Sequence, residues 1–323
     1  MEKFNQSGYA VVLVDARGTG ASFGKVSLPF SSEEIQDYSQ VVDWIVSQPW
    51  SKQKVGAYGI SYDGNTAELL AVANNPAVKA VVPRFNDFDA YAHLIFPGRL
   101  LNKGFLEGWN EGNKFLDFSP CSFAQGEEFC EQFKKNTGIV GVKPVDEDKD
   151  LHLLAEAVKQ HSGNLDLYQA ALQTTYRDDV FGNSSLTIKN TSPYNFKKEV
   201  VTLYATSSEN DGAFFVYLED VDESGKVTYI TEGQLRPLHR KVSRERPPYT
   251  IFGINHSFNE KDGQSLEPGK TTKLTCDLLP TSVLIKQGHQ IRVAIAGHDK
   301  DSFVRYPAEG TPEITILRNA VSA

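Results

Sequence analysis

The chain has 323 residues, of which 40% are hydrophobic and 11% aromatic, so it has enough apolar material for a core and enough length for two domains. Its formal net charge of −8 argues against a nucleic-acid-binding protein, because such proteins normally have a surplus of Lys and Arg. No apolar run approaches the ~18 residues of a membrane span, and no charged-then-apolar leader precedes the first expected strand. We therefore expect a cytoplasmic protein that binds neither nucleic acid nor a membrane.

The first 85 residues predict alternating strands and helices. The apolar run in "GYAVVLVDARG", residues 8–18, is typical of a strand buried on both faces of a parallel sheet. A capping box of Ser31 and Glu34 then opens a helix over residues 32–47. Residues 54–60 predict a second strand, residues 62–74 a second helix, and "VKAVVPRF" a third strand. This β-α-β-α-β order indicates a parallel sheet with helices on both faces.

The pattern of apolar residues changes twice after this sheet. Residues 86 to about 190 contain helical patterns in "EDKDLHLLAEAVKQH" and "LDLYQAALQ", whereas "FPGRLLNKG" and "DFSPCSF" look like loops, which together predict a helical cap. From residue 200 the pattern has a period of two, and turn residues at 222–225 and 268–269 separate the strands. We expect an antiparallel β-sandwich whose inward faces include two sets of apolar residues: Leu274, Cys276 and Leu278, and Ile291, Val293 and Ile295.

One serine stands where a strand meets a helix, in "GISYDG". A strand that ends in Gly-x-Ser-x-x-Gly and turns at once into a helix presents the serine hydroxyl at the carboxyl edge of the sheet. The helix N-terminus suits the oxyanion that forms when Ser61 attacks a carbonyl, and the backbone N–H of Tyr62 is the expected donor. The alternative is a plain helix-capping serine, which is common at such junctions.

Several stretches of the chain resemble the CocE/NonD family of α/β-hydrolases, which includes cocaine esterase and the Xaa-Pro dipeptidyl-peptidases. The similar blocks are "GYAVVLVDARGTGAS", "VVDWIVSQPW", "KVGAYGISYDG", "PRFNDFDAY", "YRDDVFGNSS" and "LEPGKTTKLTCDLLPTSVLIKQGHQIRVAIAG". The resemblance implies an α/β plus β chain: a partial α/β-hydrolase core over residues 1–86, a helical cap over 87–198 and a jelly-roll domain over 199–323. It also implies a serine esterase or peptidase that forms an acyl-enzyme on Ser61 and acts on a small ester or peptide.

The chain departs from this family in the residues that would activate the serine. The family has a tyrosine upstream of the first strand that supplies a second oxyanion donor, and we find no counterpart. The family also carries its catalytic aspartate and histidine after the cap, in Gly-Trp-Tyr-Asp-like and Trp-x-His-like stretches. Here "TSPYNFKK" runs directly into the sandwich-like "EVVTLYATSS". A serine without a base is a weak nucleophile, so we expect impaired activity.

Two other interpretations stay open: a non-catalytic binding module carried by the sandwich, and an incomplete gene product with an abrupt junction near Lys198.

For every histidine of the chain we expect a surface or packing role. His256, in a loop, is the least unsuitable base. The seven histidines are His93, His152, His161, His239, His256, His289 and His298.

The remaining polar residues predict structure more than chemistry. We expect no metal and no cofactor, because no His, Cys or carboxylate residues show ligand spacing. Asp15 and Arg17 are expected to form a turn and an ion pair. Cys121 and Cys130 are expected to be free thiols, with a disulfide as the alternative. A sheet of few strands leaves an open edge, so we also expect the first 198 residues to be the less stable part and to form homo-oligomers through that edge.

Overall fold

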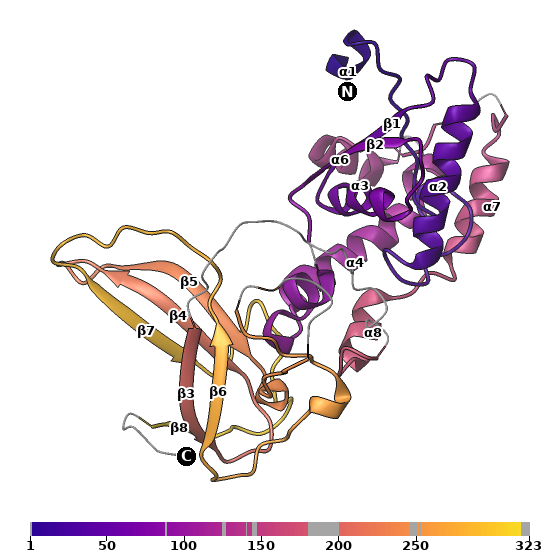
Figure 1. Ribbon diagram of the computed structural model, residues 1–323. Helices are drawn as coiled ribbons and strands as arrows, with labels where there is room; N and C mark the ends of the chain where they lie inside the picture. The colour runs from indigo at the N-terminus through magenta and orange to yellow at the C-terminus, as the bar shows by residue number, and fades with distance from the viewer. Residues whose placement is uncertain are drawn as a thin grey trace. The chain divides into compact units, whose positions relative to one another are not determined.

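Figure 1 shows a computed structural model of the chain, which describes residues 2–87, 89–124, 127–139, 141–143, 147–179, 200–245, 251 and 253–317. The residues gather into two compact units, each assembled from separate stretches of the sequence. The first unit comprises Met1–Ala57, Thr66–Val82 and Gly108–Leu167; the second comprises Tyr58–Asn65, Pro83–Glu107 and Tyr168–Ala323. The expected domain boundaries at 86 and 198 stay a prediction, and the second of them, with the expected junction, falls outside the described residues. No described helix is both long and apolar enough to cross a membrane.

Most of the helices fall in the first two-thirds of the chain. One half of the capping box predicted for α2 is formed, because the Ser31 hydroxyl accepts the Glu34 N–H at 3.2 Å. The Glu34 carboxylate accepts the Phe30 N–H at 2.8 Å, one residue before the expected Ser31 N–H, which donates to the Leu28 carbonyl. Four helices were not predicted, α1, α4, α5 and α6. Of these, α5 is a single turn inside "DFSPCSF", a stretch whose pattern predicts a loop. The helices are α1 Glu2–Gln6, α2 Ser32–Ser47, α3 Tyr62–Val72, α4 Lys103–Asp117, α5 Pro120–Phe123, α6 Glu128–Thr137, α7 His152–His161 and α8 Leu167–Gln173.

A parallel strand pair, β1 Val55–Ile60 and β2 Val78–Arg84, flanks α3. The Val55 N–H donates to the Ala77 carbonyl at 2.9 Å, and the Ser61 N–H donates to the Arg84 carbonyl at 3.0 Å. Because the residue numbers rise together on both strands, the pair is parallel, as predicted. One face of the pair is bare: Tyr58 and Ile60 are each 52% exposed and Val82 is 48% exposed.

The first predicted strand is not formed. No strand is assigned within residues 8–18, and the apolar side chains of Tyr9, Leu13 and Val14 are 66%, 72% and 56% exposed. A strand needs a neighbour for its backbone hydrogen bonds, which periodicity alone does not guarantee. At the end of this segment the Asp15 carboxylate instead accepts the Ala21 N–H at 3.0 Å, which closes a loop. From residue 8 to residue 84 the order observed is therefore helix, strand, helix, strand.

The second unit contains the sandwich, built from two antiparallel three-stranded sheets with orders β6-β3-β8 and β5-β4-β7 (Figure 1). As predicted, Leu274, Cys276 and Leu278 face the core, where each is at most 6% exposed. They pack against apolar residues of both sheets, including Ala205, Phe214, Val216 and Leu235. The strands are β3 Val200–Ser207, β4 Phe214–Val221, β5 Val227–Leu235, β6 Thr272–Asp277, β7 Gln290–Ala296 and β8 Ile314–Ile316.

The second apolar set predicted for the sandwich core is exposed. Ile291, Val293 and Ile295 do share one face of β7, but they are 61%, 54% and 38% exposed. β7 pairs with β4 on one side, and Figure 1 shows it at the outer edge of its sheet. The expected burial is wrong because an edge strand is covered only if the opposite sheet extends over it.

The segment that follows β2 is fastened to the outer face of the sandwich. Leu100 is fully buried against Phe215 and neighbouring apolar side chains. The Arg236 N–H donates to the Gly98 carbonyl at 2.9 Å. Gly98 has a φ of +59°, and a Cβ there would collide with the Gln234 carbonyl, so this close approach requires glycine. Two short helices shape the segment: η1 Tyr91–Ile95, a π-helix, and η2 Pro97–Arg99, a 3₁₀ helix.

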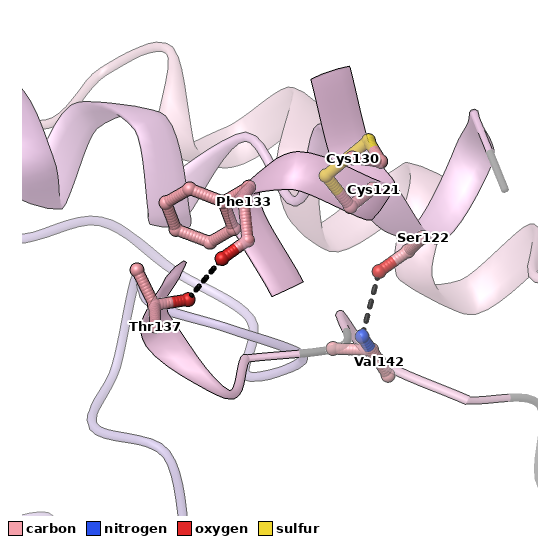
Figure 2. The surroundings of a disulfide bond; sticks show 6 residues. All are labelled: Cys121, Ser122, Cys130, Phe133, Thr137 and Val142. Atoms are coloured by element: carbon pink, nitrogen blue, oxygen red, sulfur yellow. Dashed lines mark hydrogen bonds between the residues drawn. A yellow bond between two sulfur atoms is a disulfide. The ribbon is translucent and has the colours of Figure 1, made fainter. Parts of the chain in front are cut away.

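A disulfide joins α5 and α6 in the first unit (Figure 2). Cys121 and Cys130 are 7% and 5% exposed, and their Cα atoms lie 5.4 Å apart. Beside them the Ser122 hydroxyl accepts the Val142 N–H at 2.7 Å. The expectation of free thiols is therefore wrong for this pair, because the turn between the two helices brings residues nine apart in sequence to disulfide distance. Cys276 is the free cysteine, buried in the sandwich.

Candidate functional site

Ser61 occupies a sharp turn between β1 and α3, as the sequence predicts. β1 ends at Ile60, α3 begins at Tyr62, and Ser61 between them has a φ of +60°. A residue other than glycine is seldom found in this left-handed region, where the side chain crowds the backbone. The Ser61 side chain is exposed. The strand-to-helix turn thus holds the hydroxyl out at the end of β1, in the geometry of a nucleophile elbow.

Ser31 shows what an ordinary capping serine looks like in the same chain. Its φ is −61°, and its hydroxyl accepts the N–H of Glu34, three residues into α2. Ser61 has a φ of opposite sign, and within the described residues its hydroxyl takes part in no hydrogen bond. The capping alternative therefore does not account for Ser61, because a cap acts through that side-chain hydrogen bond.

Two glycines make the turn possible. A Cβ on Gly59 would collide with the Asp63 carbonyl, and a Cβ on Gly64 would lie 2.5 Å from the Arg84 carbonyl oxygen. Both contacts are to backbone atoms, which cannot rotate away. The first turn of α3 therefore packs directly on the ends of the two strands, and only glycine fits at either position.

The elbow is also fastened to the segment after β2. The Asn65 side chain is 3% exposed, and its Oδ1 accepts the Asp87 N–H at 2.8 Å. Burial raises the pKa of the Asp87 carboxyl, while the positive charge of His93 and a hydrogen bond from Asn65 oppose that rise. Asn65 and Asp87 thus position the elbow, and sequence reasoning missed both because their spacing carries no motif.

The start of α3 can stabilise negative charge beside Ser61. The Asn65 N–H makes the first i→i−4 hydrogen bond of the helix, to the Ser61 carbonyl at 3.0 Å. The positive end of the α3 dipole lies at this helix start, beside the backbone N–H of Tyr62. Such a helix start is suited to an oxyanion next to the serine.

The histidines do not complete a catalytic set in the described structure. Both ring nitrogens of His256 face carbonyl oxygens, those of Lys241 at 3.1 Å and Thr275 at 3.0 Å, and burial lowers its pKa. His161 is held in the same way, by two carbonyls at 2.6 and 2.8 Å. The His289 Nδ1 lies 2.9 Å from the Asp220 carboxylate, a packing role as expected. No hydrogen bond between a histidine and the Ser61 hydroxyl is found in the part of the chain that is described.

Other predicted residues have structural roles or lie elsewhere. Arg17 pairs with Asp37 through two bonds of 2.5 and 2.7 Å, not with Asp15 as expected, because Asp15 is engaged by its own loop. Among the described residues, no group of three or more His, Cys, Asp or Glu is placed to hold a metal. A pocket of about 210 Å³ is found in the sandwich, not at Ser61; its lining includes His298, Arg305 and Tyr306.

Comparison with protein families places both parts of the chain. Residues 1–218 match the family model described as X-Pro dipeptidyl-peptidase (S15 family), and residues 198–320 match the model of the X-Pro dipeptidyl-peptidase C-terminal non-catalytic domain. The chain belongs to the S15 family. Together with its relatives and its fold, this makes it a hydrolase-family protein of the CocE/NonD type, as the sequence blocks indicate. The fold class predicted from the sequence is confirmed.

The relatives of this S15-family chain are named as esterases and peptidases. A protein named "Putative serine esterase" from Mycobacterium bovis is 27% identical and the match covers 99% of this chain and 83% of that protein. Cocaine esterase from Rhodococcus is 37% identical over 109 residues, 33% of this chain and 19% of that enzyme. The crystal structure of a CocE/NonD family hydrolase from Staphylococcus aureus superposes with a TM-score of 0.57 at 17% identity, covering 94% of this chain and 77% of that one.

The esterase alignment differs from the chain in length. It extends over 528 positions, more than the 323 residues of this chain. The Mycobacterium protein therefore has residues inside the aligned region for which this S15-family chain has no counterpart.

Proposed function

We propose that the chain is a serine hydrolase in which Ser61 is the nucleophile and the Tyr62 N–H donates to the oxyanion. The observation that supports this most is the φ of +60° at Ser61, exposed between β1 and α3. Ser61 Oγ would attack the carbonyl carbon of a small ester or peptide, and its proton would leave to a base. The alcohol or amine departs with a proton, and water then releases the acid from the acyl-enzyme.

The proposal includes a slow reaction, because no histidine among the described residues makes a hydrogen bond to the Ser61 hydroxyl. Among the described histidines, His161 and His256 cannot act as the base, because carbonyl oxygens lie against both ring nitrogens of each. The alignment with the Mycobacterium protein supports the slow reaction, because that protein has aligned residues with no counterpart in this chain. A catalytic acid and base would be sought among those residues. Without the histidine, such a site keeps only the residual catalysis of the oxyanion donors and binding.

Ester hydrolysis tests both parts of this proposal. We expect slow release of p-nitrophenol from p-nitrophenyl acetate that disappears in Ser61→Ala and is unchanged in Ser31→Ala, the matched capping serine. Equal rates for Ser61→Ala and the wild type would remove Ser61 from the chemistry. A turnover as fast as that of an efficient esterase would instead contradict the missing base.

The second candidate function, a non-catalytic binding module, rests on the sandwich pocket lined by His298, Arg305 and Tyr306. A pocket that combines an aromatic ring with donors is suited to a small polar ligand. Retained binding of such a ligand by Ser61→Ala, with no hydrolysis by the wild type, would favour this function.

We also propose that two copies associate through the bare face and open edges of the β1–β2 pair. The pair has exposed apolar side chains, Tyr58, Ile60 and Val82, and no further strand among the described residues pairs with it; both features favour contact with another chain. Hydrogen exchange of a monomeric sample should then show faster exchange in Val55–Ile60 than in Thr272–Asp277. Equally slow exchange in both strands, without any dimer on sedimentation, would contradict the proposal.

A further inference from the structure

Three polar side chains lie in the interior of the second unit and carry atoms that have no partner among the described residues. Tyr91, Arg99 and His239 are 0%, 1% and 3% exposed. They come from η1, η2 and the short helix η4 Pro237–His239. The Arg99 guanidinium lies 4.9 Å from the centre of the Tyr91 ring, and both rings, Tyr91 and His239, contact Phe258.

Five polar atoms of these three side chains have no hydrogen-bond partner of normal geometry among the described residues. Within the described structure, the Arg99 Nε and Nη2 and the Tyr91 hydroxyl lack a hydrogen bond. Both ring nitrogens of His239 lack one of normal geometry, although the Thr175 backbone lies close enough to raise the pKa of that ring. A buried polar group left without a partner destabilises the folded state, and a charged one does so more strongly. Native proteins therefore fill such places with a ligand, an ion or ordered water.

The vacant atoms of Arg99 form one edge of its guanidinium, and two other arginines show what that edge binds. Arg17 uses its Nε and Nη2 to hold the Asp37 carboxylate at 2.5 and 2.7 Å. Arg236 uses the same two atoms on the Asp211 carboxylate, at 2.9 and 2.6 Å. The same edge of Arg99 is buried and has no carboxylate. A planar pair of donors fits a group with two oxygens.

A hydrogen-bond acceptor can reach the vacant donors of Arg99 only in the plane of the guanidinium. One face lies 4.0 Å from the centre of the Phe96 ring, so acceptors cannot approach from that side. The carboxylates nearby are committed elsewhere: Asp89 pairs with Arg177 at 2.6 Å, and Asp179 accepts two backbone N–H groups at 2.8 and 2.7 Å. Among the described residues, Arg99 thus presents the donors of a carboxylate clamp, and no carboxylate occupies them.

The protonation of the cluster suits an anion. Burial lowers the pKa of Arg99 to about 10, so that it stays positive at neutral pH. Burial, and next the Arg99 charge, lower the pKa of His239 to about 2, so that its ring is neutral and can donate one hydrogen bond and accept another.

We propose that Arg99, Tyr91 and His239 form a buried site for a small carboxylate anion, held by the Nε–Nη2 edge of Arg99. The Tyr91 hydroxyl supplies a further donor, and the neutral His239 ring adds no charge that competes with the anion. Because the three side chains are at most 3% exposed, the ligand is small, of the size of formate or acetate. This site goes beyond the hydrolase function and does not depend on it.

Thermal unfolding in different salts tests the site. We expect the Tm in sodium acetate or formate to exceed that in sodium chloride at equal ionic strength, by about 2–4 °C for each tenfold increase above the dissociation constant. Arg99→Met and Tyr91→Phe should abolish or weaken this difference. Arg17→Met, which breaks a satisfied clamp in the first unit, should keep it.

Tyr91→Phe keeps the ring and its contacts, so the test stands even if Arg99→Met fails to fold. Calorimetric titration of the wild type with acetate gives a second readout, a saturable heat that chloride does not produce. Equal Tm values in acetate, formate and chloride, or an acetate effect that persists in Tyr91→Phe and Arg99→Met, would overturn the proposal and leave ordered water as the occupant.

Discussion

Replacing Ser61 by glycine and by alanine measures the strain of the elbow directly. Both variants remove the hydroxyl, so their difference reports the backbone alone. A side chain in the left-handed region costs roughly 1–2 kcal/mol relative to the right-handed region, and glycine escapes that cost. Glycine also gives the unfolded chain more freedom, which costs about 0.5–1 kcal/mol. With Ser61 at a φ of +60°, we expect Ser61→Gly to be more stable than Ser61→Ala by about 0.5–1 kcal/mol.

Urea denaturation at pH 7 gives the free energies of unfolding, and Ser39 supplies the matched control. Ser39 lies inside α2, where glycine is less favourable than alanine by about 1 kcal/mol. The order of stability should therefore reverse between the two positions. If Ser61→Ala were as stable as Ser61→Gly, Ser61 would not be held in the left-handed region and the elbow would have to be abandoned.

Three further predictions concern packing, pH and oxidation. Gly64→Ala should lower the free energy of unfolding by more than about 2 kcal/mol, because the added Cβ would lie 2.5 Å from a backbone oxygen. Gly112→Ala is the control: its Cβ meets open space, so this variant should stabilise α4 by up to about 1 kcal/mol. Calorimetry of the two variants measures the difference. His239 binds a proton below about pH 6.5 in the unfolded chain, but only near pH 2 in the folded chain. Below pH 6.5 the free energy of unfolding should therefore fall by about 1 kcal/mol per pH unit. His239→Gln should reduce this slope, as measured by urea denaturation at each pH. Reduction of Cys121–Cys130 should cost about 2–3 kcal/mol, and a double serine variant should no longer respond to the reductant; a thiol assay of the unfolded, unreduced protein should count one thiol, not three.

Local patterns predict the elements whose determinants are close in sequence. The Ser31–Glu34 box fixes the start of α2, and "GISYDG" predicts the turn at Ser61 because its glycines and serine act within six residues. The inward face of β6 follows in the same way from its period of two.

The sequence does not reveal what depends on distant neighbours. The apolar run at Tyr9–Val14 is typical of a buried strand, yet a strand forms only where another strand accepts its hydrogen bonds. The same reason leaves the apolar face of β7 exposed, since burial requires cover from another part of the chain. The cluster of Tyr91, Arg99 and His239 brings together segments about 140 residues apart, which no spacing rule detects.

Mass spectrometry of the protein after incubation with a fluorophosphonate is the most direct test of the central claim, that Ser61 is a nucleophile without an efficient base. Peptide mapping locates the adduct, and intact mass at successive times gives its rate. We expect one adduct, on Ser61, that forms over hours and is absent in Ser61→Ala. An adduct on another residue, or none at all, would contradict the nucleophile; complete labelling within seconds would show that a base stands beside Ser61.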